Sequence, residues 1–224
     1  MIHCDYKFIF VRTAKTGSTS IIENWVPGYI STSKLPDHMV LPGTNTWKHD
    51  NNHIPLYHVK ENMSRGDFNT FYKFGFVRNP YDRVVSAYRY VSDWHMYHDG
   101  SNPYSDFKDF IIKLFVIKEK PSEAVKYGPQ HVFVDGCDRV GKFENIQREY
   151  NIICENIGVY PQRLTWENHD YAWRYLPKHG WSDYHKHNPL PEPKHYTSYY
   201  DDYTRSVVER VFAEDLDVYN YRFG

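Results

Sequence analysis

Short apolar runs rich in aromatic and β-branched residues occur twice in the first part of the chain, at residues 8–11 and 71–77. Each run is followed by a few polar residues and then by apolar residues at helical spacing, which predicts a strand, a tight turn and a helix. The first helix is expected to begin at Ser18. The second is expected to begin at Asn79-Pro80, because proline is accepted in the first turn of a helix.

Helical spacing of apolar residues returns in four further segments, at residues 53–63, 105–118, 144–157 and 201–216. Pro55 suits the first turn of the first segment, and the acidic pair Asp201-Asp202 suits the N-terminal end of the last. Two short β-prone runs, at residues 131–134 and 139–143, predict further strands. One more strand is expected near Tyr29-Ile30.

Residues 160–200 show no periodicity, but they carry many aromatic side chains, which disordered segments lack. We expect an ordered, irregular segment whose basic and aromatic clusters, Lys186-His187-Asn188 and Lys194-His195-Tyr196, could lie over a nucleotide. A chain of 224 residues can bury roughly 70% of its unfolded surface in one domain. We therefore predict a single domain over residues 1–224 with an α/β fold, in which helices cover both faces of a central, mainly parallel sheet in three layers.

The polar turn after the first strand has the residue types of an anion-binding loop. Lys15 brings a positive charge, Gly17 lets the backbone approach a ligand closely, and Ser18, Thr19 and Ser20 bring hydroxyl donors. A helix that begins here also directs its first backbone N–H groups toward the loop. The turn is therefore predicted to be a P-loop-like cradle for a phosphate-like group, and an ordinary strand-to-helix connection with a capping serine is the alternative.

Two differences separate this loop from the nucleotide-binding P-loop. The first glycine of that motif is absent, and Lys15 precedes Gly17 by two positions where the motif has lysine directly after glycine. A different anion is expected. At the second turn, Arg78 ends the strand and Ser86 lies two turns into the helix, so both can converge on one anion at the carboxyl edge of the sheet. A structural arginine that caps the sheet is the alternative there.

The chain has 27 basic and 28 acidic residues, and its formal net charge of −1 argues against bulk electrostatic binding to nucleic acid or to an anionic membrane. Its three cysteines, Cys4, Cys137 and Cys154, are too scattered for a disulfide framework or a zinc site. No signal peptide is recognisable and no apolar run reaches ~18 residues. A cytoplasmic protein without an integral membrane segment is expected, and its oligomeric state, with a homo-oligomer as one alternative, is left open.

Residues 10–20 resemble the 5′-phosphosulfate-binding loop of sulfotransferases that use 3′-phosphoadenosine-5′-phosphosulfate (PAPS). Residues 74–88 resemble the 3′-phosphate-binding segment of the same superfamily. The second likeness is greatest to the carbohydrate sulfotransferase group, sulfotransferase family 2, which includes the heparan and chondroitin enzymes. Residues 130–145 and 194–202 resemble two further blocks of that group, and all four follow in the same order.

This resemblance implies a role for each matching residue. The phosphosulfate would be held by Lys15, Thr16, Gly17, Ser18 and Thr19. Arg78 and Ser86 would hold the 3′-phosphate. In the heparan-type enzymes a histidine between the two loops acts as general base, and His53 occupies the matching place. Pro55 and His58 depart from the family pattern there, which leaves His58 as a second candidate.

The expected reaction is transfer of a sulfuryl group from PAPS to a hydroxyl of a carbohydrate-type acceptor. Lys15 would stabilise the charge on the leaving phosphate and His53 would accept the proton of the acceptor hydroxyl. No metal is expected, since the leaving group carries fewer charges than a nucleoside triphosphate. Phenols, lipid-linked sugars and tyrosyl peptides also suit the many aromatic residues. The alternatives are an Mg-ATP-dependent kinase with a degenerate P-loop and a non-catalytic nucleotide-binding module.

Overall fold

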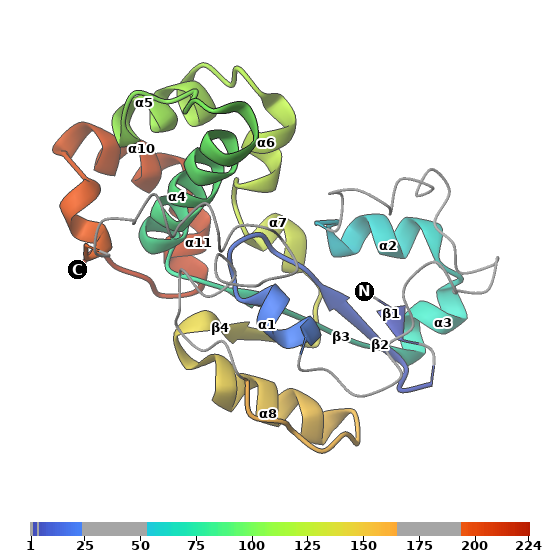
Figure 1. The fold of residues 1–224 in the computed structure, drawn as a ribbon. Helices are drawn as coiled ribbons and strands as arrows, with labels where there is room; N and C mark the ends of the chain where they lie inside the picture. Colours follow the sequence, from blue (N-terminus) through green and yellow to red (C-terminus); the bar gives the residue numbers. More distant parts are fainter. Residues whose placement is uncertain (1, 4, 24–52, 165–193) are drawn as a thin grey trace. The chain divides into compact units, whose positions relative to one another are not determined.

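The computed structural model describes residues 2–3, 5–23, 53–164 and 194–224, and these residues form two compact units. The first unit comprises residues 1–78 and 129–167, and the second comprises residues 79–128 and 168–224. We treat each unit by itself (Figure 1). The single domain expected over residues 1–224 therefore stays a prediction. The strand near Tyr29-Ile30 and the cluster Lys186-His187-Asn188 lie outside the described residues.

The first unit is built on a four-stranded sheet in the order β1-β2-β3-β4. Its strands are β1 (Ile2–His3), β2 (Phe8–Val11), β3 (Tyr72–Val77) and β4 (Arg139–Lys142). The edge strand β1 runs antiparallel to β2, whereas β2, β3 and β4 are parallel to one another. The sheet is thus mainly parallel, as the sequence predicts, and the expected strands at residues 8–11, 71–77 and 139–143 are confirmed within one residue at each end.

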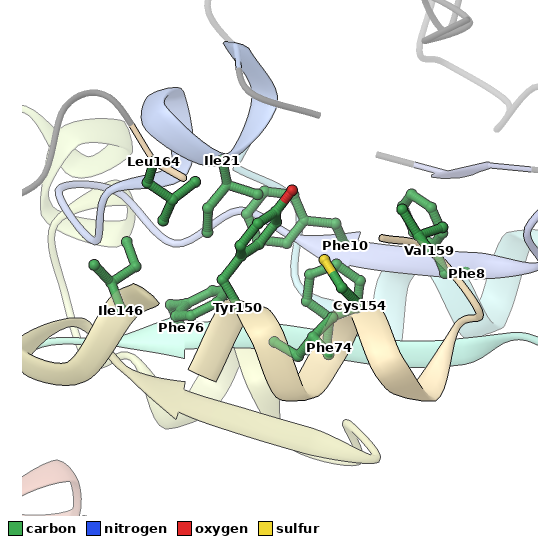
Figure 2. Packing of buried hydrophobic residues seen from close by; sticks show 11 residues of the cluster. Phe8, Phe10, Ile21, Phe74, Phe76, Ile146, Tyr150, Cys154, Val159 and Leu164 are labelled. Atoms are coloured by element: carbon green, nitrogen blue, oxygen red, sulfur yellow. The ribbon is translucent and has the colours of Figure 1, made fainter. Parts of the chain in front are cut away.

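Alternation of side chains divides the sheet into two buried faces. Phe10 of β2 and Phe74 of β3 are opposite each other in register, and their rings stack with centroids 5.0 Å apart. They belong to a core cluster that also includes Tyr150 of helix α8 (Ile146–Asn156) and Ile21 of helix α1 (Ser18–Glu23). Figure 2 shows these side chains directed toward one another between the strands and α8. One face of the sheet is therefore covered by α8 and α1.

The opposite face of the sheet is covered by helices α7 (His131–Val134) and α2 (Leu56–Asn62) (Figure 1). A Cβ built on Gly75 of β3 would lie 2.6 Å from Val134 Cγ1, so α7 packs directly on the middle strand at a position that only glycine fits. Leu56 and Val59 of α2 are buried. The first unit therefore has the predicted three layers, and the α/β class is confirmed.

One predicted strand of the first unit is wrong. Residues 131–134 form the short helix α7, in which the N–H of Phe133 donates to the carbonyl of Gln130 at 2.9 Å. Phe133 and Val134 are both buried while Val132 is 41% exposed, a pattern that a strand with alternating faces does not allow. A run of four apolar residues cannot be assigned to strand or helix by periodicity alone. The unit is completed by helix α3 (Arg65–Thr70) and a 3-10 turn at Phe143–Asn145.

Among its described residues the second unit contains helices and connecting loops but no strand. Its helices are α4 (Pro80–Asp99), α5 (Phe107–Ile111), α6 (Pro121–Lys126), α10 (Asp202–Val211) and α11 (Ala213–Val218), with a π-helical turn at Ile112–Val116 and a 3-10 turn at Tyr196–Tyr199. Helix α10 packs on α4, α5 and the π-helical turn. Within the part of the chain that the structure describes, no helix has both the length and the apolar character needed to cross a membrane.

Two predicted helices of the second unit differ in detail. The helix expected over residues 105–118 begins at Phe107 and changes to π geometry at Ile112. The helix expected over residues 201–216 is interrupted at Phe212, so its last residues belong to α11. Its predicted start is confirmed, because Asp201 caps α10: the N–H of Thr204 donates to the Asp201 carboxylate at 2.7 Å.

Candidate functional site

The turn between β2 and α1 is a tightly wound loop of six residues, 12–17. Lys15 and Gly17 both have left-handed backbones, with φ of 64° and 77°. The Thr16 hydroxyl donates to the Thr13 carbonyl at 2.9 Å and so closes the loop on itself, and the N–H of Ile21 donates to the Gly17 carbonyl at 3.2 Å to open α1. The predicted strand, turn and helix are confirmed. The backbone of Lys15 is in a region that residues other than glycine rarely adopt, which marks this position as one that its surroundings constrain.

Packing makes glycine necessary at position 17. A Cβ on Gly17 would lie 2.5 Å from Ile146 Cδ1 and 3.0 Å from Phe143 Cε2, both well inside ordinary contact distance. The loop therefore rests directly on the side chains at the start of α8. Because Gly17 belongs to the loop and these two residues to the layer beneath it, the shape of the turn is fixed by the core as well as by its own hydrogen bonds.

The predicted phosphosulfate-binding residues are not equally accessible. Thr16 is 1% exposed and Ser18 is also buried, whereas Thr19 is exposed and Lys15 is half-buried. The amides of Ser18 and Thr19 belong to the first turn of α1 and have no acceptor within that helix. Thr16 therefore supports the loop through its bond to the Thr13 carbonyl, and the first amides of α1 and the Lys15 side chain supply its positive character.

Arg78 follows directly on the last residue of β3 and reaches back to this loop. Its Nη1 lies 3.4 Å from the Lys15 carbonyl oxygen, and its Cζ lies 4.4 Å from the centroid of the Phe143 ring. The side chain is 5% exposed. The structure thus brings together two of the residues that the sequence singled out, Lys15 and Arg78, from the ends of two neighbouring parallel strands.

Gln130 is a residue that sequence reasoning missed. Its Oε1 accepts the N–H of Arg78 at 2.8 Å, and its Nε2 donates to the Arg78 carbonyl at 2.8 Å. It is 0% exposed. The sequence signal for it is weak, since a single glutamine between Gly128-Pro129 and an apolar run is compatible with any loop position.

Ser86 lies in α4 and is buried. Because it belongs to the second unit and Arg78 to the first, their convergence on one anion stays a prediction. The start of α4 is confirmed as predicted: Asn79 is the N-cap and accepts the N–H of Tyr81 at 3.1 Å, with Pro80 as the first helical residue. Asn79 Nδ2 also donates to the Arg222 carbonyl at 2.9 Å.

Arg83, one turn into α4, is 1% exposed and serves the structure of the second unit. Its guanidinium donates to the carbonyls of Gly128 at 2.8 Å, Tyr127 at 3.2 Å and Lys126 at 3.3 Å. These are the carbonyls at the end of α6, where a cation also offsets the helix dipole. Arg83 therefore has a structural role at the end of α6.

His53 is hydrogen-bonded to the loop. Its Nδ1 lies 2.8 Å from the carbonyl oxygen of Arg12, the first residue of the turn. A carbonyl can only accept, so Nδ1 carries the hydrogen and Nε2 is the basic nitrogen of the neutral ring. His58 is in α2, where its Nδ1 lies 3.9 Å from Glu61 Oε2. The structure therefore connects His53 with the loop that holds Lys15, whereas His58 faces a carboxylate of its own helix.

These features define an α/β protein of the P-loop-like class, with a lysine loop, an arginine and a histidine gathered at the carboxyl edge of a mainly parallel sheet. The chain belongs to the sulfotransferase family, whose family model matches residues 1–222. The resemblance inferred from the motifs is confirmed. The protein is therefore a transferase that moves sulfuryl groups to a hydroxyl-bearing acceptor.

Comparison with solved structures finds a crystal structure of a sulfotransferase from Alicyclobacillus acidocaldarius. The two chains are 15% identical, the match covers 97% of this chain and 96% of the other, and the TM-score is 0.42. Comparison with curated proteins finds no match.

Proposed function

We propose that the protein transfers the sulfuryl group of PAPS to a hydroxyl of a carbohydrate-type acceptor. One observation carries the proposal: backbone carbonyls of the same six-residue loop contact both Arg78 and His53. The Lys15 carbonyl is next to the arginine, and the Arg12 carbonyl accepts the histidine hydrogen. Arg78, which would bind phosphate, and His53, which would act as the base, therefore both contact the loop whose lysine resembles the family's phosphosulfate contact.

The donor would be held through its anionic groups. PAPS carries a phosphosulfate on its 5′ side and a phosphate on its 3′ side. In our proposal the first is bound by Lys15, Thr16, Gly17, Ser18 and Thr19, with Thr16 contributing its backbone N–H because its hydroxyl donates to the Thr13 carbonyl. The second is bound by Arg78 and Ser86, and the guanidinium is suited to this role because its planar fork matches two phosphate oxygens.

Lys15 would supply the main stabilisation of the transition state. Sulfuryl transfer resembles phosphoryl transfer in its in-line geometry and in the negative charge that builds on the leaving phosphate. An ammonium group fixed near the bridging oxygen stabilises that charge most when the bond breaks. The proposal uses no divalent metal, and among the described residues no three His, Cys, Asp or Glu side chains are grouped as metal ligands.

His53 would act as the general base. With Nδ1 committed to the Arg12 carbonyl, Nε2 accepts the proton of the acceptor hydroxyl as its oxygen attacks sulfur. The same carbonyl then stabilises the imidazolium that forms, since it accepts a hydrogen bond from a charged donor. The preference for a carbohydrate acceptor is supported by the resemblance to the carbohydrate sulfotransferase group and by the 18% aromatic content, because flat rings stack on sugars.

Ligand stabilisation tests the donor. We expect 3′-phosphoadenosine-5′-phosphate to raise the melting temperature in a thermal-shift assay, because a ligand at ~100 times its Kd stabilises the fold by roughly 2.7 kcal/mol. ATP with Mg²⁺ is the matched comparison. Stabilisation by Mg-ATP alone would favour a kinase, and stabilisation by the nucleotide without transfer to any acceptor in a labelled-donor screen would favour a binding module.

Two histidine variants test the base. His53→Ala should lower kcat by about 10² to 10⁴-fold, the usual contribution of general-base catalysis. It should leave the affinity for 3′-phosphoadenosine-5′-phosphate nearly unchanged in titration calorimetry. His58→Ala is the control on the neighbouring helix and should keep wild-type turnover. The opposite pattern, with only His58→Ala inactive, would assign the base to His58.

A further inference from the structure

We propose that Gln130 is a positioning residue that holds Arg78 in the orientation in which it binds the donor's phosphate. This inference rests on the proposed function. It is carried by the two hydrogen bonds, each 2.8 Å long, between the Gln130 carboxamide and the backbone N–H and carbonyl of Arg78.

The position of Arg78 explains why it needs such a partner. The pairing of β3 with β4 ends at Val77 opposite Lys142, and its pairing with β2 ends at Gly75 opposite Val11. Arg78 is thus the first residue beyond both ladders. A carboxamide has the same donor and acceptor as a peptide group, so Gln130 pairs with Arg78 as one further strand residue would.

Burial makes these two bonds strong determinants of backbone direction. Gln130 and Arg78 are 0% and 5% exposed, so water does not compete for the bonds, and loss of the carboxamide would remove two hydrogen bonds from a buried stretch of backbone. Arg78 is also the last residue before the chain leaves the first unit, and Gln130 follows shortly after its return at Pro129. The pair therefore connects the residue at which the chain leaves the first unit with a residue close to the point where it returns.

Fixing the backbone fixes the direction in which the side chain leaves it. The guanidinium extends over the Phe143 ring to within 3.4 Å of the Lys15 carbonyl, a distance at the long end for a hydrogen bond. These contacts act on the outer end of the side chain. Gln130 acts on its inner end by fixing the backbone of Arg78, so the cationic group is in place before the anion arrives.

The first test compares two nucleotides that differ by one phosphate. In titration calorimetry, Gln130→Met should raise the Kd for 3′-phosphoadenosine-5′-phosphate about tenfold, the equivalent of one hydrogen bond to a charged group, and should change the Kd for adenosine 5′-phosphate less than twofold. Gln147→Met is the matched control. Its carboxamide accepts the Leu164 N–H at 2.8 Å and donates to the Gln162 carbonyl at 3.1 Å, elsewhere in the same unit. Equal losses for both nucleotides would overturn the inference.

The second test asks whether Gln130 acts through Arg78. Arg78→Ala should itself weaken 3′-phosphoadenosine-5′-phosphate selectively, and adding Gln130→Met to it should change the Kd no further. A role in general stability would persist in the Arg78→Ala background, and that result would contradict positioning. If the wild type does not bind the nucleotide, or if Arg78→Ala is not selective, the proposed function and this inference both fail. If Arg78→Ala is selective and Gln130→Met is not, this inference alone fails.

The third test covers the case in which Gln130→Met does not fold. Gln130→Glu has the same shape, and its protonated carboxyl has one donor and one acceptor as the carboxamide has. Its ionised form has no donor for the Arg78 carbonyl. Because burial raises the pKa of a carboxyl group, the affinity of Gln130→Glu for the nucleotide should recover as the pH falls toward 5, relative to wild type at the same pH. A constant ratio of the two affinities across this range would overturn the inference.

Discussion

The two turns that lead from strand to helix reach the same edge of the sheet by different means. The turn at residues 12–17 is six residues long, includes two left-handed positions, and is closed by its own bond between Thr16 and Thr13. The turn at Arg78-Asn79 has two residues. It is held by side-chain and backbone groups from distant parts of the sequence, namely Gln130 on the first unit and the Arg222 carbonyl on the second.

This difference teaches how each turn can present a ligand-binding group. The longer turn offers backbone amides and a lysine from a shape that local residues create. The shorter turn offers one arginine, whose backbone N–H and carbonyl pair with a remote residue, Gln130. Substitutions in the first turn should therefore act locally, and those that affect the second turn should include positions far along the chain.

Among substitutions within the two turns, the largest effect is expected at Lys15. Lys15→Ala should lower kcat by about 10² to 10³-fold, as loss of one preorganised donor to a developing charge usually does. Lys7→Ala is a close control, because Lys7 is also a lysine with a left-handed backbone, φ 48°, but lies before β2 and is exposed. Lysine and alanine both carry a Cβ, so neither variant adds the steric strain of a left-handed backbone, and steady-state kinetics isolates the ammonium group. Equal losses would show that the effect is not specific to the charge of Lys15.

A stability effect of a few kcal/mol is expected at Gly17. Gly17→Ala should cost about 1–2 kcal/mol for its left-handed backbone and about 1–3 kcal/mol for crowding against Ile146 and Phe143. Gly158→Ala isolates the first part, because Gly158 has a similar φ of 72° and open space around its Cα. Urea unfolding measures both. If the two variants lose equal stability, Ile146 and Phe143 move aside at little cost and crowding contributes little.

A smaller effect is expected where the second turn enters its helix. Asn79→Ala removes the cap of α4 and the bond to the Arg222 carbonyl, and should cost about 1–2 kcal/mol in urea unfolding. Asn145→Ala is the control, since Asn145 occupies the N-cap position of α8 without a side-chain cap bond. It should change the free energy of unfolding by less than about 0.5 kcal/mol. A large loss of stability for Asn145→Ala would show that the side-chain cap bond is not what distinguishes the start of α4 from the start of α8.

The smallest perturbation needs no substitution and probes the segment that carries Gln130. Burial raises the pKa of the Cys137 thiol from 9.0 to about 12. At pH 8 this lowers the thiolate fraction about 10³-fold relative to an ordinary thiol, and only the thiolate reacts readily with iodoacetamide. Mass spectrometry of the Cys137 peptide should therefore show slow labelling that quickens as the pH rises toward 12. Fast labelling at pH 8 would show that residues between α7 and β4 open often.

The sequence predicts most of the fold because strong local signals coincide with the final structure. The strand and helix on either side of residues 12–17 and the cap at Asn79-Pro80 are confirmed, as is the buried face of α2. The errors arise where tertiary packing decides: residues 131–134 are too short a run to specify strand or helix, and the break at Phe212 follows no proline or glycine. At the interruption the buried Phe212 ring packs edge-on against Phe115 with centroids 5.5 Å apart.

The candidate site is predicted in part for the same reason. Lys15, Gly17 and Arg78 lie in compact motifs, so their residue types and spacing are informative. Gln130 begins a block that resembles the family, but its partner lies 52 residues away, so the sequence does not show that it pairs with the residue after β3. The hydrogen bond from His53 to Arg12 is equally remote in sequence, and it supports our proposal that His53 is the base.

The Phe143 ring belongs to neither turn and yet bears on both, with the Arg78 guanidinium over its face and Gly17 against its edge. Any lineage that exchanged this ring for a smaller side chain would loosen the packing of both turns in a single mutational step. Evolution should therefore retain an aromatic residue there, or change it only together with positions 17 and 78. An alignment of close homologues in which position 143 drifts independently of both would contradict this expectation.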